Sequence, residues 1–169
     1  MINFFKRKFN KGFSLVEILI YLAIFTAVSI LVINSFIIVV STFTKIRSNH
    51  DLVNSGSNSL ERISREIRQA KSIDSTSIFD SDSSSLKLVD PDGNIIVFDK
   101  NLDDLRISKN GEVIGNLLVN NVSLDKLIFK HIVTANSEAI KIEIEIEDTN
   151  SKISKVEKFY DTVVLRGSY

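Results

Sequence analysis

Residues 11–44 read KGFSLVEILIYLAIFTAVSILVINSFIIVVSTFT. Within them, residues 18–44 form a run of 27 residues that contains neither a charged side chain nor a proline. As an α-helix this run is about 40 Å long, and the hydrocarbon core of a bilayer is about 30 Å thick. Its few polar residues are scattered, whereas a helix of a small soluble domain has one polar face. The run therefore predicts a membrane-spanning helix.

The segment before the run is basic. Lys6, Arg7, Lys8 and Lys11 precede it with no acidic residue among residues 1–12, whereas only two cations, Lys45 and Arg47, follow it closely. Because cytoplasmic flanks of membrane helices are enriched in Lys and Arg, we expect a single pass with the N-terminus in the cytoplasm and the C-terminal part exported.

Two simpler interpretations of the apolar run exist. A secretory signal peptide has an apolar region of about 7–15 residues followed by a small-x-small cleavage site. The run here is longer, and its best candidate site, Val39-Val40-Ser41, fits that pattern poorly. A plain signal anchor is the second interpretation, and hydropathy alone does not exclude it.

Glu17 directly precedes the uncharged run. A carboxylate in a membrane segment costs on the order of 3 kcal/mol and usually marks function. An acidic side chain at the edge of a span also has a simpler explanation, since it can extend to the interface. Taken alone, Glu17 leaves both explanations open.

The context of Glu17 favours a functional role. Lys11-Gly12-Phe13-Ser14-Leu15-Val16-Glu17 follows a short basic leader and precedes an apolar helix. This arrangement resembles the processing motif of type IV prepilins and pseudopilins: basic leader, Gly, Phe, Ser or Thr, Leu, any residue, Glu.

The resemblance implies roles for three residues. A membrane aspartyl peptidase, the prepilin peptidase/methyltransferase, would cut after Gly12 and methylate the new N-terminus at Phe13. Glu17 would pair with the N-terminal amine of a neighbouring subunit during assembly. The implied partners are this enzyme, other pilins or pseudopilins and the inner-membrane assembly platform. The implied location is the cytoplasmic membrane and then a filament.

The subtype is suggested by two weaker features. Major pilins of the type IVa class usually carry a proline in this helix, but the only proline here is Pro91. The amphipathic residues 60–70 resemble the end of the N-terminal helix in minor pilins and J-type pseudopilins. A minor subunit is therefore expected, with the major pilin as the alternative. The motif does not distinguish secretion, twitching and DNA-uptake systems.

The helix is expected to continue as an amphipathic segment over residues 45–72. Its predicted apolar face is a seven-residue series supplemented by Ile63, and Gly56 is expected to loosen the middle of the segment. The series comprises Ile46, Val53, Leu60 and Ile67.

The remaining residues, 73–169, predict a β-rich extracytoplasmic domain after a Ser- and Asp-rich loop over 72–85. Strands are expected at 85–89, 95–98, 102–107, 112–119, 124–133 and 152–165. The clearest strand is residues 140–146, where isoleucine alternates with Lys or Glu. A helix followed by an antiparallel sheet gives an α+β fold, which is also the pilin architecture. The domain boundaries are thus leader 1–12, membrane helix 13–44, amphipathic helix 45–72 and β-domain 73–169.

Composition excludes several kinds of site. The chain has no cysteine, so disulfides, thiolate zinc sites and cysteine nucleophiles are absent. Without the four leader cations, 17 basic and 21 acidic residues remain, which disfavours nucleic-acid binding. His50 and His131 are isolated, so we expect no enzyme and no cofactor.

Acidic residues near turns raise the possibility of calcium binding. Some members of the resembled family bind calcium, but the sequence Asp90-Pro91-Asp92-Gly93-Asn94 lacks the spacing of a calcium loop and its distal Glu. An ordinary turn is favoured there and for the other candidates, Asp80 and Asp82. The row Glu143, Glu145 and Glu147 predicts a solvated face rather than a metal site.

A second function class also fits the chain. A signal-anchored protein whose β-domain binds an extracellular ligand would share the apolar helix and the exported domain. The two hypotheses differ at Gly12, because only a prepilin requires cleavage there and a free Phe13.

Overall fold

The computed structural model describes residues 14–135, 137–149 and 155–166. The chain forms two compact units that meet between Thr44 and Lys45. One helix, α1 (Leu15–Gln69), contributes to both units. In the first unit it is the sole described element, and its large apolar side chains are exposed around the whole circumference.

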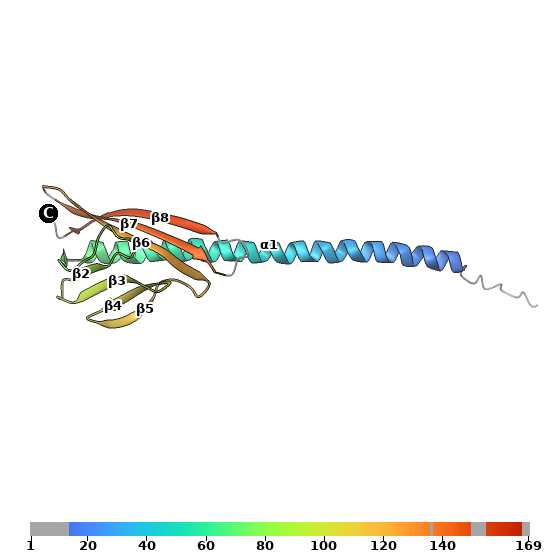
Figure 1. Ribbon diagram of the computed structural model, residues 1–169, viewed down its shortest axis with the longest axis horizontal. Helices are drawn as coiled ribbons and strands as arrows, with labels where there is room; N and C mark the ends of the chain where they lie inside the picture. The colour runs from blue at the N-terminus through green and yellow to red at the C-terminus, as the bar shows by residue number, and fades with distance from the viewer. Residues whose placement is uncertain (1–13, 136, 150–154, 167–169) are drawn as a thin grey trace, which may run out of the picture. The chain divides into compact units, whose positions relative to one another are not determined.

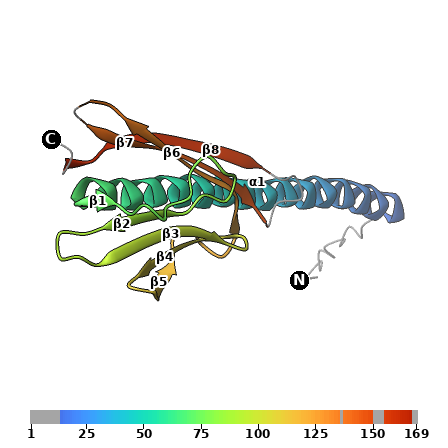
Figure 2. The ribbon, with the colours of Figure 1, turned by 60° about the vertical axis from the view of Figure 1, so that its left-hand side comes forward.

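In the described part of the second unit, the C-terminal part of α1 is combined with eight strands in two antiparallel sheets. The first sheet has the order β1-β2-β3-β4-β5 and the second has the order β6-β7-β8. Figures 1 and 2 both show β2–β5 on one side of the C-terminal part of α1, with β7 and β8 on the other. The predicted α+β, pilin-like architecture is therefore confirmed. The strands are β1 (Ser72–Ile73), β2 (Leu86–Val89), β3 (Ile95–Asn101), β4 (Asp104–Lys109), β5 (Glu112–Asn116), β6 (Val122–Val133), β7 (Glu138–Asp148) and β8 (Val156–Val164).

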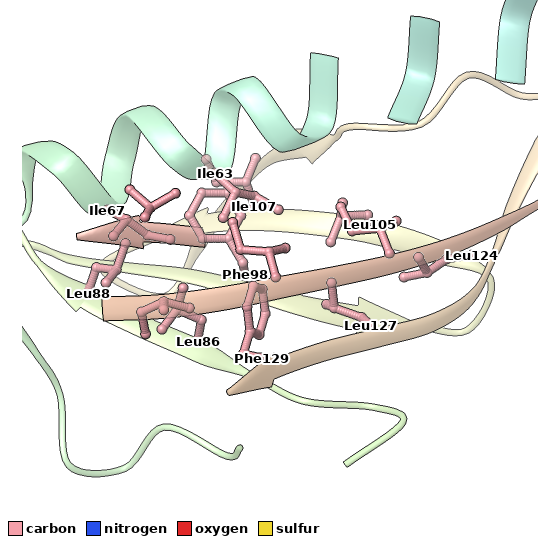
Figure 3. Close-up of a cluster of buried hydrophobic side chains, with 14 of the residues drawn as sticks. Ile63, Ile67, Leu86, Leu88, Phe98, Leu105, Ile107, Leu124, Leu127 and Phe129 are labelled. Carbon is pink, nitrogen blue, oxygen red and sulfur yellow. The ribbon is translucent and has the colours of Figure 1, made fainter. Parts of the chain in front are cut away.

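Alternating side chains place one face of each sheet in the core. In β7, the isoleucines 140, 142, 144 and 146 are almost completely buried, as their spacing of two predicts. They join Phe98 of β3, Phe129 of β6 and Ile63 of α1 in one cluster. Figure 3 shows side chains from α1 and from both sheets meeting there.

The predicted apolar face of the amphipathic helix is partly wrong. Ile67 is buried and Leu60 is partly buried, but Val53 and Ile46 are exposed. An α-helix drifts about 20° per seven residues, so a strict seven-residue series leaves the buried face as it is followed back from Ile67. The residues buried on α1 are Leu52, Ser55, Gly56, Ser59, Ile63, Ser64 and Ile67.

Gly56, which was predicted to loosen the middle of the amphipathic segment, lies within the continuous helix. α1 runs unbroken through it, and Gly56 is buried against β8. A Cβ atom there would lie 2.3 Å from Cε2 of Phe159, which is far inside van der Waals contact. The glycine therefore lets the ring of Phe159 approach the helix backbone.

The predicted loop over 72–85 contains short pairings that the sequence did not indicate. β1 pairs with β2, and Ser83 bridges to Leu127 of β6. The backbone N–H groups of Asp80 and Ser84 donate to carbonyl groups of β6 at 3.0 and 2.9 Å. This segment thus occupies the edge of β6 that faces away from β7.

Candidate functional site

The N-terminus of α1 places Glu17 in its first turn. The carbonyl oxygen of Ser14 accepts hydrogen bonds from the backbone N–H groups of Glu17 and Ile18, at 3.0 and 3.2 Å. A carboxylate in a first turn is stabilised by the helix dipole and by the unpaired N–H groups of that turn. The predicted processing residues Gly12 and Phe13 lie outside the described residues.

Tyr21 is a neighbour of Glu17 that the sequence analysis missed. Its hydroxyl group donates a hydrogen bond to Oε1 of Glu17 at 3.0 Å. The spacing of four residues puts both side chains on one face of the helix, so this contact was predictable from the sequence. Glu17 is only half-exposed, whereas the residues on either side of it are exposed.

Five hydroxyl groups of the first unit bond to backbone carbonyl groups of the helix. Thr26 donates to the carbonyl groups of Leu22 and Ala23, both at 2.9 Å. Four other hydroxyl groups bond to carbonyl groups three or four residues earlier, as is usual in apolar surroundings. They belong to Ser35, Ser41, Thr42 and Thr44.

Residues 7–33 match the family model of the prokaryotic N-terminal methylation motif. The chain carries the N-terminal motif of type IV pilin-like and pseudopilin precursors. The match includes Glu17 and the first half of the apolar run. Comparisons with curated proteins and with solved structures give no match.

This pilin-like motif has three consequences at a coarse level. It implies processing by a prepilin peptidase and assembly with other pilins. Together with α1, which is long and apolar enough to cross a membrane, it indicates membrane anchoring. The motif belongs to structural proteins and is not a signature of an enzyme family.

The turn between β2 and β3 is organised by Asp90. Its carboxylate accepts hydrogen bonds from the Asn94 side chain at 2.7 Å and from the Asn94 backbone at 2.8 Å. Lys109 adds an ion pair at 3.1 Å. The Asn94 side chain contributes most, and with these partners it lowers the pKa of Asp90 to about 2, although partial burial opposes the shift.

The acidic residues considered for calcium lie in two places. Asp90, Asp92 and Asn94 belong to the β2–β3 turn, whereas Asp80 and Asp82 lie along β6, where their backbones bond to Phe129 and Leu127. Among the described residues, no three His, Cys, Asp or Glu side chains are grouped to hold a metal ion.

The glutamate row of β7 lies on a face with lysine neighbours. Glu143 pairs with Lys141 at 2.7 Å and with Lys130 of β6 at 3.7 Å. The hydrogen bond from Lys141 is the main cause of the lowered pKa of Glu143. Glu145 pairs with Lys158 of β8 at 3.1 Å. The row therefore contributes cross-strand ion pairs.

The two histidines occupy different surroundings. His131 stacks on Phe79 with ring centroids 5.2 Å apart, and its Nε2 lies 3.3 Å from Glu138. His50 lies on α1, where a ring nitrogen is 2.9 Å from the side-chain nitrogen of Asn54. Each histidine is thus engaged in a local structural contact.

Proposed function

We propose that the chain is a structural subunit, a minor pilin or minor pseudopilin, that is cut between Gly12 and Phe13 and assembled through its N-terminal helix. The observation that carries this proposal is the methylation-motif match over residues 7–33. The position of Glu17 in the first turn of α1 supports it.

Glu17 would fix the position of the subunit in the filament. A carboxylate in apolar surroundings favours one opposite charge, and the free amine of a neighbouring Phe13 would supply it. Until that amine binds, the hydroxyl group of Tyr21 would remain a hydrogen-bond donor to the carboxylate of Glu17.

The first unit is apolar around its whole circumference, which suits both a subunit in the membrane and a subunit in a filament. Before assembly, the exposed side chains of residues 15–44 would face lipid, and in a filament they would face the helices of neighbouring subunits. The proposed parts are the leader 1–12, the membrane and filament helix 13–44, the amphipathic helix 45–72 and the exported β-domain 73–169. The described helix itself ends at Gln69.

A minor subunit is proposed because Pro91 is the sole proline of the sequence and lies in the β2–β3 turn, so α1 lacks the proline usual in major pilins. Protein counting in native membranes tests this part. A chain far more abundant than the other pilin-like proteins of its system would instead be the major subunit.

The intact mass and N-terminal sequence of the protein from native membranes test the whole proposal. A chain that begins at Phe13 and is heavier by one methyl group supports it. A chain that still begins at Met1 contradicts it and favours the signal-anchored binding module. Gly12→Val should keep the leader, because a side chain at the cleaved position obstructs an extended backbone in a narrow protease site. Asn10→Ala is the control and should be processed normally.

A further inference from the structure

Asn34 is the one carboxamide in the uncharged run of residues 18–44. Its side chain is exposed and makes no hydrogen bond to any residue that the structure describes. It therefore differs from the hydroxyl groups of Thr26, Ser35 and Ser41, which bond to the backbone of the helix.

A carboxamide has two N–H donors and an oxygen that accepts two hydrogen bonds. In the middle of a bilayer neither water nor lipid tails satisfy these groups, so a hydrogen-bonding partner on another helix is strongly favoured. Asn34 is about midway along the run and is too far from its ends for its short side chain to reach an interface.

The face that carries Asn34 has large side chains one turn away, Ile30 and Ile38, and small side chains farther along the helix. At 100° per residue, Ala27 and Ser41 lie seven residues away and Ala23 lies eleven residues away, so all three point within about 20° of Asn34. Ala23 and Ala27 are the two alanines of the run, and they are spaced as small-xxx-small. Small residues in this spacing let two membrane helices approach closely at Ala23 and Ala27, on the face that also carries the carboxamide of Asn34.

We propose that this face, formed by Ala23, Ala27, Asn34 and Ser41, binds the same face of a second copy of the chain in the membrane. Copies inserted in the same direction place Asn34 at the same depth. Because a carboxamide both donates and accepts, two such groups satisfy each other around a twofold axis. A single asparagine at such a position also fixes the alignment of two helices.

Cross-linking of the purified full-length chain in lipid vesicles tests the proposal. The chain has no cysteine, so one introduced thiol is the only one present. Ser41→Cys lies on the proposed face, and Phe43→Cys lies nearly opposite at a similar depth. Under mild oxidation, we expect a disulfide-linked dimer from Ser41→Cys and little from Phe43→Cys.

Adding Asn34→Leu to Ser41→Cys should weaken dimerisation by about 3- to 30-fold, the range expected for one hydrogen-bonded pair between membrane helices. Asn34→Gln should retain most of the dimer, and Ser35→Ala is the control for a polar neighbour whose hydroxyl is bonded to its own helix.

Equal cross-linking at both cysteines, or no effect of Asn34→Leu, would overturn the proposal. Dimers that form only when another pilin is present would also overturn it. The vesicle test uses the unprocessed chain, so its result is independent of cleavage at Gly12.

Discussion

Glu17 and Tyr21 show how one helical turn accommodates a charge beside lipid. The turn supplies unpaired N–H groups and the positive end of the helix dipole, and the tyrosine hydroxyl group supplies a further donor. None of these groups carries a full positive charge, which is what the amine of a neighbouring subunit would supply in the proposed assembly.

Replacing Glu17 by Ala or Val should leave membrane insertion intact, since both changes make the helix more apolar. Incorporation into filaments should fall strongly, because the neighbouring amine loses its partner. Membrane fractionation and filament shearing, each followed by immunoblotting, measure the two steps. Glu61→Ala is the matched control, because Glu61 lies on the exposed face of the same helix and pairs with Arg65. Normal incorporation of the Glu17 variant into filaments would contradict the role proposed for Glu17 in assembly.

The β2–β3 turn should become less stable in acid because of Asp90. Its pKa is about 2 in the folded chain, against an ordinary value of 3.8. The carboxylate thus stabilises the fold fully above about pH 4, and this contribution is lost as the pH falls toward 2. Thermal unfolding of the detergent-solubilised chain should show wild type more stable than Asp90→Asn at about pH 6, with the gap closing toward about pH 2. Asp92→Asn, in the same turn but exposed, should show no such convergence.

At the level of elements, the contact between α1 and β8 depends on Gly56. Its neighbours Ser55 and Ser59 are also buried, so this part of the helix presents small side chains to the sheet. Phe159 fills the space against the bare helix backbone. Nearby, the hydroxyl group of Ser64 donates to Asp161 of β8 at 2.6 Å, which holds the same strand about two turns farther along the helix.

Gly56→Ala should therefore destabilise the fold despite the better helix propensity of alanine. Overpacking costs about 1–3 kcal/mol and the better helix propensity offsets about 1 kcal/mol, so we expect a net loss of up to about 2 kcal/mol in the free energy of unfolding. Denaturant titration measures the loss, and Phe159→Leu in the same chain should reduce it. Gly115→Ala on β5 is the control, since a Cβ there has no neighbouring atom within 4 Å. A loss of equal size at both glycines would contradict the packing argument.

The sequence predicted those elements whose patterns are local. The alternating isoleucines of β7 and the turn residues of the β2–β3 hairpin indicated strands that the structure contains. Glu17 was identified from a contiguous motif, and its contact with Tyr21 follows from helical spacing. The role of Gly56 was not predictable, because Phe159 lies far away in the sequence. The division of the strands into two sheets likewise depends on contacts between distant segments.

At the scale of the whole molecule, the two units differ in what stabilises them. The first has no buried apolar cluster among its described residues, so its helix depends on lipid or on other chains. The second has its own core, whose buried residues extend from Leu52 to Leu165. Apart from α1 itself, every element that contributes to this core lies in the second unit.

A fragment comprising residues 45–169 should accordingly fold in water without detergent. Its described core draws on α1 and both sheets, and none of the residues in that core precedes Leu52. We expect a monomer by gel filtration and a cooperative thermal transition close to that of the β-domain in the full chain. Ile142→Ala should lower its free energy of unfolding by about 2–5 kcal/mol, because Ile142 is completely buried. Ile132→Ala, at a position that is 41% exposed, should cost far less. An aggregated fragment, or equal effects of the two isoleucine variants, would mean that the second unit depends on residues outside this core.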